Sequence, residues 1–81
     1  MLTDILIRAV EIKDGKPVDV AEGNIPKEQA DNCKVGVILN SIKVHLDFRE
    51  VGSQQWKITK REELKTEIGV DYVRLEVQRY P

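Results

Sequence analysis

The chain has 81 residues, of which 33% are charged, 41% hydrophobic and 5% aromatic, and its net charge is −1. This composition is typical of a globular domain and excludes a disordered or fibrous chain. A chain of this length forms a single compact domain over residues 1–81, with one modest core and without a deep cleft between two lobes. The balanced charge leaves no basic footprint of the kind that marks a nucleic-acid-binding protein.

The one cysteine, Cys33, cannot form an internal disulfide. The first residues of the chain meet charge too early for a signal peptide or a membrane span. We therefore expect a reducing, cytoplasmic setting, in a cell or in a virus that replicates in one.

The β-branched residues Val and Ile outnumber Leu and Ala, which favours a sheet over long helices. We expect an α+β fold, a small and mostly antiparallel sheet with two short helices, in the order ββαβββαβ. The short connections make most neighbouring strands antiparallel.

The first two strands form a predicted hairpin. Residues 4–13 are one strand, the Asp14-Gly15 pair tolerates the positive φ of a tight turn, and residues 18–21 are the second strand. Side-chain matching favours one register, although it leaves Gly15 in mid-loop: Ile12 opposite Val18, Val10 opposite Val20 and Arg8 opposite Glu22.

Gly23-Asn24 is predicted to end this strand, and a short helix follows over residues 26–32. Pro26 suits the first helical position, where its missing amide hydrogen costs nothing. The helix is weakly apolar, so we expect it to add little to the core beyond Ile25, Ala30 and Cys33.

Residues 33–49 predict a second hairpin with a two-residue loop at Asn40-Ser41. One face is then apolar, pairing Leu39 with Ile42, Val37 with Val44, Val35 with Leu46 and Cys33 with Phe48. The other face is mostly polar and includes Lys43, His45 and Arg49. The rival interpretation, a helix from Pro26 to Leu46, would have to absorb Gly36 and the β-branched run.

The next strand covers residues 54–59, with Trp56 and Ile58 on one side. Thr59 and Glu62 have the spacing of a capping box, which predicts a helix over residues 60–68. Leu64 and Ile68 would face the core from this helix, and Gly69 would end it.

Strict alternation marks the last strand, residues 71–80. Its predicted inward residues are Val73, Leu75 and Val77, and its outward residues are Tyr72, Arg74, Glu76, Gln78 and Tyr80.

Nothing in the sequence names a reaction. A thiol nucleophile needs a base within hydrogen-bonding reach, and the predicted hairpin separates Cys33 from His45 across the sheet. The glycines are isolated and form no phosphate loop, and one Cys with one His cannot supply a zinc set within one chain, although a site shared across a dimer stays open. We expect neither catalysis nor a cofactor nor a metal.

The candidate binding surface is the outward face of the last strand, with Tyr72, Arg74, Gln78 and Tyr80, joined by Lys43 and Arg49 from the central hairpin. Tyr and Arg concentrate binding energy at protein interfaces. Aromatics interleaved with arginine also suit base stacking, so a single-stranded RNA- or DNA-binding module is the alternative.

The run Ile5-Leu6-Ile7 turns at least one large apolar side chain away from the core, which favours a covering subunit or element. We therefore expect a homodimeric, non-catalytic protein-interaction module, an adaptor or inhibitor-like accessory protein that occupies a surface of its partner. A small accessory or inhibitory protein, including one encoded by a virus or mobile element, fits the size of this chain.

Overall fold

The computed structural model describes residues 4–40, 44–49 and 54–80, of which 66% lie in strands and 7% in a helix. The elements are β1 (Asp4–Lys13), β2 (Lys16–Pro26), α1 (Lys27–Asp31), β3 (Ile38–Leu39), β4 (Asp47–Phe48), β5 (Gln55–Lys65) and β6 (Asp71–Tyr80). The expected α+β fold with two helices is therefore wrong. The protein is mostly β, with one short helix among the described residues.

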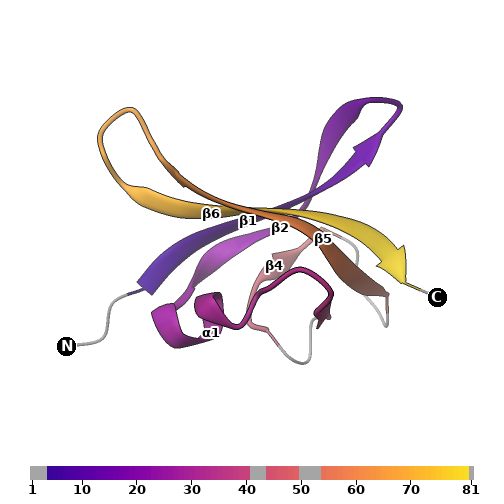
Figure 1. Cartoon of the computed structure of the whole chain (residues 1–81), viewed down its shortest axis with the longest axis horizontal. Coiled ribbons are helices and arrows are strands. Elements are labelled where there is room, and N and C mark those ends of the chain that lie inside the picture. Colours follow the sequence, from indigo (N-terminus) through magenta and orange to yellow (C-terminus); the bar gives the residue numbers. More distant parts are fainter. Residues whose placement is uncertain (1–3, 41–43, 50–53, 81) are drawn as a thin grey trace.

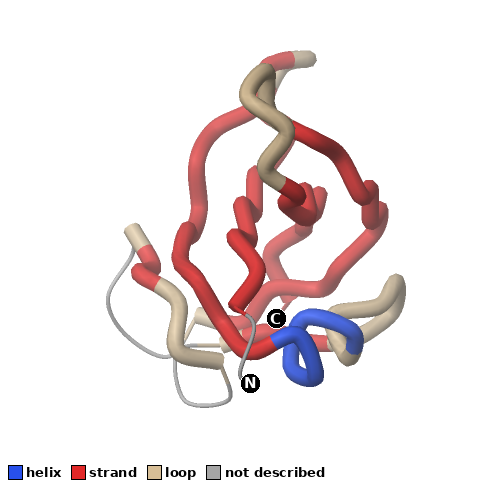
Figure 2. The backbone as a smooth tube through the Cα atoms, turned by 90° about the vertical axis from the view of Figure 1, so that its left-hand side faces the viewer, coloured by secondary structure: helices blue, strands red, loops and turns tan. Residues whose placement is uncertain are grey.

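The strands form one six-stranded sheet in the order β3-β5-β6-β1-β2-β4. Two long antiparallel hairpins, β1–β2 and β5–β6, are joined through a parallel pairing of β1 with β6. In Figure 1 the two hairpin tips diverge on the upper side of the molecule, while α1 lies below the sheet. Figure 2 shows how strongly the strands curl. The sheet is thus mixed, with its parallel pair at the centre.

The β1–β2 hairpin closes through a two-residue turn in which Asp14 and Gly15 have φ values of 52° and 77°. Such a turn sets Ile12 opposite Pro17 rather than Val18. A bulge between Ala9 and Val10 then shifts the register by one residue, so that the predicted pairing of Arg8 with Glu22 is correct. Close to the turn the predicted register was wrong because the sequence does not show where a bulge inserts its extra residue.

β2 continues through Gly23-Asn24, where the sequence predicted its end. A Cβ atom on Gly23 would lie 3.3 Å from Cδ2 of Leu46, so glycine at this position permits a close approach. α1 begins one residue later than predicted, after Pro26, and spans little more than one turn.

The predicted hairpin over residues 33–49 does not form. β3 pairs with β5, placing Ile38 opposite Lys57, and β4 pairs with β2, placing Phe48 opposite Ala21. The two short segments thus extend opposite edges of the sheet. Val35 is 63% exposed instead of lying in an apolar pair, and residues 41–43 of the predicted loop lie outside the described residues.

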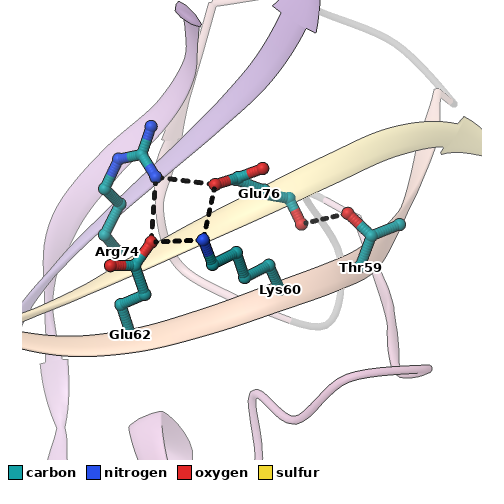
Figure 3. Close-up of polar contacts among 5 residues, drawn as sticks. All are labelled: Thr59, Lys60, Glu62, Arg74 and Glu76. Atoms are coloured by element: carbon teal, nitrogen blue, oxygen red, sulfur yellow. Dashed lines mark hydrogen bonds and ion pairs between the residues drawn. The ribbon is translucent and has the colours of Figure 1, made fainter.

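The predicted second helix over residues 60–68 is wrong because β5 continues to Lys65. The hydroxyl of Thr59 donates to the carbonyl of Glu76 (3.1 Å) rather than capping a helix (Figure 3). Gly69 has a φ of 84° and belongs to the β5–β6 turn, in which the Thr66 amide donates to the Val70 carbonyl (2.9 Å). Ile68, predicted to face the core, is 87% exposed at the tip.

The hydrophobic core lies on one face of the sheet, between the sheet and the layer formed by α1 and the segment that follows it. The predicted inward residues of β6 are buried, as are Trp56 and Ile58 of β5. The other buried residues of this cluster are Ile7, Ala9, Val20, Ala21, Ile25, Ala30, Cys33, Leu39, Val44 and Leu46. We call the face on the other side of the sheet the outer face.

Candidate interaction surface

Strand register defines which side chains share the outer face. Because side chains alternate along each strand, the residues at one face follow from the Cα partners of β6. The outer face carries Lys60, Glu62 and Leu64 from β5; Tyr72, Arg74, Glu76, Gln78 and Tyr80 from β6; Leu6, Arg8 and Val10 from β1; and Asp19, Glu22 and Asn24 from β2.

The structure gathers four of the six predicted site residues on this face. Tyr72 and Arg74 are half-buried near the middle of the sheet, whereas Gln78 and Tyr80 are exposed toward the C-terminal end of β6. Arg49 follows β4 at the sheet margin, with β1 and β2 between it and β6. Lys43 lies outside the described residues.

Arg74 is one member of a closed ring of charged side chains (Figure 3). Its Nη1 atom lies 2.8 Å from Oε2 of Glu76 and 3.2 Å from Oε1 of Glu62. Nζ of Lys60 closes the ring at 3.4 Å from Glu62 and 3.8 Å from Glu76. The two carboxylates therefore hold the guanidinium in one place, while its remaining terminal nitrogen points away from them in Figure 3.

A second group of charges lies on the β1–β2 side. Nε of Arg8 lies 3.5 Å from Glu22, and the same carboxylate lies 3.9 Å from Nη2 of Arg49. The Arg8 guanidinium also stands over the ring of Tyr72, 5.8 Å from its centroid. At this distance the cation and the ring face attract each other.

Arg8 belongs to this surface although the sequence did not predict it there. The alternation of Leu6, Arg8 and Val10 showed that Arg8 shares a face with them, but the neighbour of β1 on its other side was unknown. The parallel pairing places Arg8 directly beside Arg74. No local pattern in either strand indicates this contact.

Between these groups the outer face is hollowed. Val10 is 7% exposed although it is not a member of the core cluster. The hollow around it is lined by Arg8, Pro17, Asp19, Tyr72 and Arg74. It thus combines an apolar residue with two guanidinium groups and an aromatic ring.

The other candidate chemistry stays apart from this surface. Cys33 is buried, and its thiol donates to the carbonyl of Gln29 (3.4 Å), whereas His45 is exposed. Burial raises the pKa of the Cys33 thiol, and the positive charge of Arg61 offsets this only in part. The thiol is therefore protonated at neutral pH, which disfavours its use as a nucleophile.

Within residues 4–40, 44–49 and 54–80, no group of three or more His, Cys, Asp or Glu side chains is arranged to hold a metal ion. In the same ranges, no helix has the length and apolar character needed to cross a membrane.

Comparisons with protein-family models, with curated proteins and with solved structures give no significant match to this chain.

Proposed function

We propose that the protein is a non-catalytic interaction module that binds a partner protein through its outer face. It acts by occupying a surface of that partner, as an adaptor or an inhibitor-like accessory protein does. The observation that carries the proposal is the hollow around Val10, in which Arg8, Tyr72 and Arg74 converge from the two central strands. A lone, buried cysteine suits the cytoplasm as its place of action.

The residue types on the outer face and the restrained conformation of Arg74 both support protein binding. Tyr and Arg are enriched among the residues that dominate interface energies. Free arginine side chains lose much rotamer freedom when they bind, but Arg74 is already held by Glu62 and Glu76. The fitting partner surface presents an apolar or carboxylate-bearing side chain to the hollow and polar groups to its rim.

The alternative, a single-stranded RNA- or DNA-binding module, has the stack of Arg8 on Tyr72 in its favour. The pairing of the basic side chains with carboxylates argues against this alternative. Arg8, Arg49, Lys60 and Arg74 each lie within 4.0 Å of at least one carboxylate, so the surface supplies little net attraction for phosphates. We therefore place nucleic acid second.

The first experiment identifies the partner and tests the surface. Affinity capture from the native lysate, with bound proteins and nucleic acids both identified, supplies the ligand for a binding titration. The double variant Arg8→Ala with Tyr72→Ala is expected to weaken that binding by tenfold or more, about 2 kcal/mol, because it removes two anchors. Arg74 is left in place because its loss would leave Glu62 and Glu76 competing for Lys60 alone.

The matched control changes exposed charge elsewhere, Lys16→Ala with Lys34→Ala, and should bind as the wild type does. Unchanged binding by the outer-face variant, with its fold intact by circular dichroism, would exclude this surface. A captured oligonucleotide whose affinity falls steeply with salt would instead favour the nucleic-acid module.

A further inference from the structure

Among the described residues, no strand pairs with the outer edge of β5 over more than half of its length. β3 pairs with β5 at Trp56 and Lys57, and the backbone of Ile58 is bonded to Gly36 and Val37. Beyond this point, no strand in the described part of the chain pairs with the edge from Thr59 to Lys65. An open edge of this kind is a template for another strand.

The hydrogen-bond pattern shows which backbone groups face this edge. The Thr66 amide donates to the Val70 carbonyl and so begins the β5–β6 ladder. Because bonding alternates along an antiparallel pair, Arg61, Glu63 and Lys65 direct their N–H and C=O groups away from β6. The outward bonds of Ile58, one bulge earlier, agree with this alternation. A ladder of backbone donors and acceptors is therefore available.

We propose that a second copy of this chain occupies the edge, with β5 pairing antiparallel to its own counterpart around a twofold axis at Leu64. The inference does not depend on the proposed function. It joins the two sheets edge to edge and keeps both outer faces on the same side, because such an axis stands perpendicular to the sheet.

Charge selects the register. A twofold axis at Arg61, Glu62, Glu63 or Lys65 would set that residue opposite its own copy, like charge against like charge, which destabilises a strand pair. An axis at Leu64 avoids every such pair in this stretch. Within β5 it sets Leu64 opposite Leu64 and Glu63 opposite Lys65, and Glu62 then faces Thr66 at the start of the β5–β6 turn.

A further observation supports this register. Leu64, Tyr72 and Leu6 are Cα partners in one row across the outer face, and all three are half-buried. Pairing at Leu64 joins this row to its copy and makes one continuous apolar stripe.

Sedimentation of the purified protein over a concentration series tests the pairing. The wild type should form a dimer. Lys65→Glu should raise the dimer dissociation constant about tenfold, because two attractive pairs become repulsive. The exchange of Glu63→Lys with Lys65→Glu should restore the dimer, since both side chains are 72% exposed and the opposite charges meet again.

Lys57→Glu is the matched control, because Lys57 is exposed on β5 outside the paired stretch, and it should leave the dimer unchanged. A wild type that is monomeric at every concentration would overturn the proposal. So would an exchange variant that stays as weak as Lys65→Glu while both keep the wild-type circular dichroism spectrum.

A disulfide tests the register in a background of Cys33→Ala. Residues facing each other at a non-hydrogen-bonded position have Cα atoms about 4.5 Å apart, within disulfide range. Leu64→Cys should therefore cross-link two copies under mild oxidation, and Glu62→Cys should not. Cross-linking through Glu62→Cys but not Leu64→Cys would overturn the register, and neither result depends on the captured partner of the outer face.

Discussion

Arg8 and Arg74 are opposite each other on the parallel strands β1 and β6, an arrangement of like charges that costs stability by itself. Each arginine has its own acidic neighbours: Glu22 on β2 lies beside Arg8, and Glu62 on β5 and Glu76 on β6 lie beside Arg74. The sheet thus holds two adjacent guanidinium groups in fixed positions. The proposed binding of a partner relies on this order more than on the number of charges.

Cys33 gives a residue-scale prediction for pH. Burial raises the pKa of its thiol above the ordinary value of 9.0, so the folded state favours the protonated form. The protonated thiol therefore contributes to the unfolding free energy. Its contribution is fully present below the pKa that the thiol has in the unfolded chain, and it is lost as the pH rises through the pKa of the folded state. Above about pH 9, the wild type should lose unfolding free energy more steeply than Cys33→Ala.

Urea unfolding of both proteins across a pH series measures this difference. The gap between the two stability curves should stay constant at neutral pH and narrow in the alkaline range. Parallel curves throughout would mean that the thiol is solvated in the folded protein, contrary to its burial.

At the scale of elements, β5 shows why a good local helix signal fails. A capping box contributes about 1 kcal/mol at one end of a helix. As a strand, the same segment pairs with β6 from Gln55 to Lys65 and sets Glu62 opposite Arg74 and Lys60 opposite Glu76. The ladder and its cross-strand charge pairs outweigh the cap because they act along the whole segment.

Substitutions at two isoleucines distinguish the observed strand from the predicted helix in this part of the chain. Ile68→Ala should change the unfolding free energy by no more than about 0.5 kcal/mol, because the side chain is 87% exposed at the hairpin tip. Ile58→Ala should cost about 2–5 kcal/mol, since that side chain is 0% exposed in the core. Denaturant unfolding of the two variants gives both values. A large loss of unfolding free energy for Ile68→Ala would contradict the strand and favour the predicted helix over residues 60–68, in which Ile68 faces the core.

On the scale of the whole molecule, the sheet depends on contacts between chain ends. β6, the last strand, lies between β5 and β1, the first strand. Its side chains Val73, Leu75 and Val77 lie in the core, and its opposite side forms the centre of the outer face. Fold and candidate surface therefore share one strand, which must be in place before either is complete.

Removal of β6 tests this dependence. A chain ending at Gly69 should lack the cooperative unfolding transition and the amide dispersion of the full protein, because β1 and β5 lose their common neighbour. Addition of a peptide covering residues 70–81 should restore both by complementation. A truncated chain that kept its cooperative transition alone would show that β6 is dispensable to the fold.

By itself, the sequence determined what depends on near neighbours. Strand alternation correctly separated Val73, Leu75 and Val77 from Tyr72 and Arg74. The Asp14-Gly15 pair correctly placed a turn between two strands, since positive φ is a property of the residues themselves. Such features hold because alternation and turn preference act within a few residues.

Tertiary structure decided which strands became neighbours. Residues 33–49 could have paired with one another through apolar side chains, but β3 pairs with β5 and β4 pairs with β2. The segment from Thr59 to Lys65, predicted to be a capped helix, is a strand that pairs with β6. The contact of Arg8 with Tyr72 exists because β1 lies beside β6. These outcomes depend on pairing energies between distant segments, which no local pattern contains.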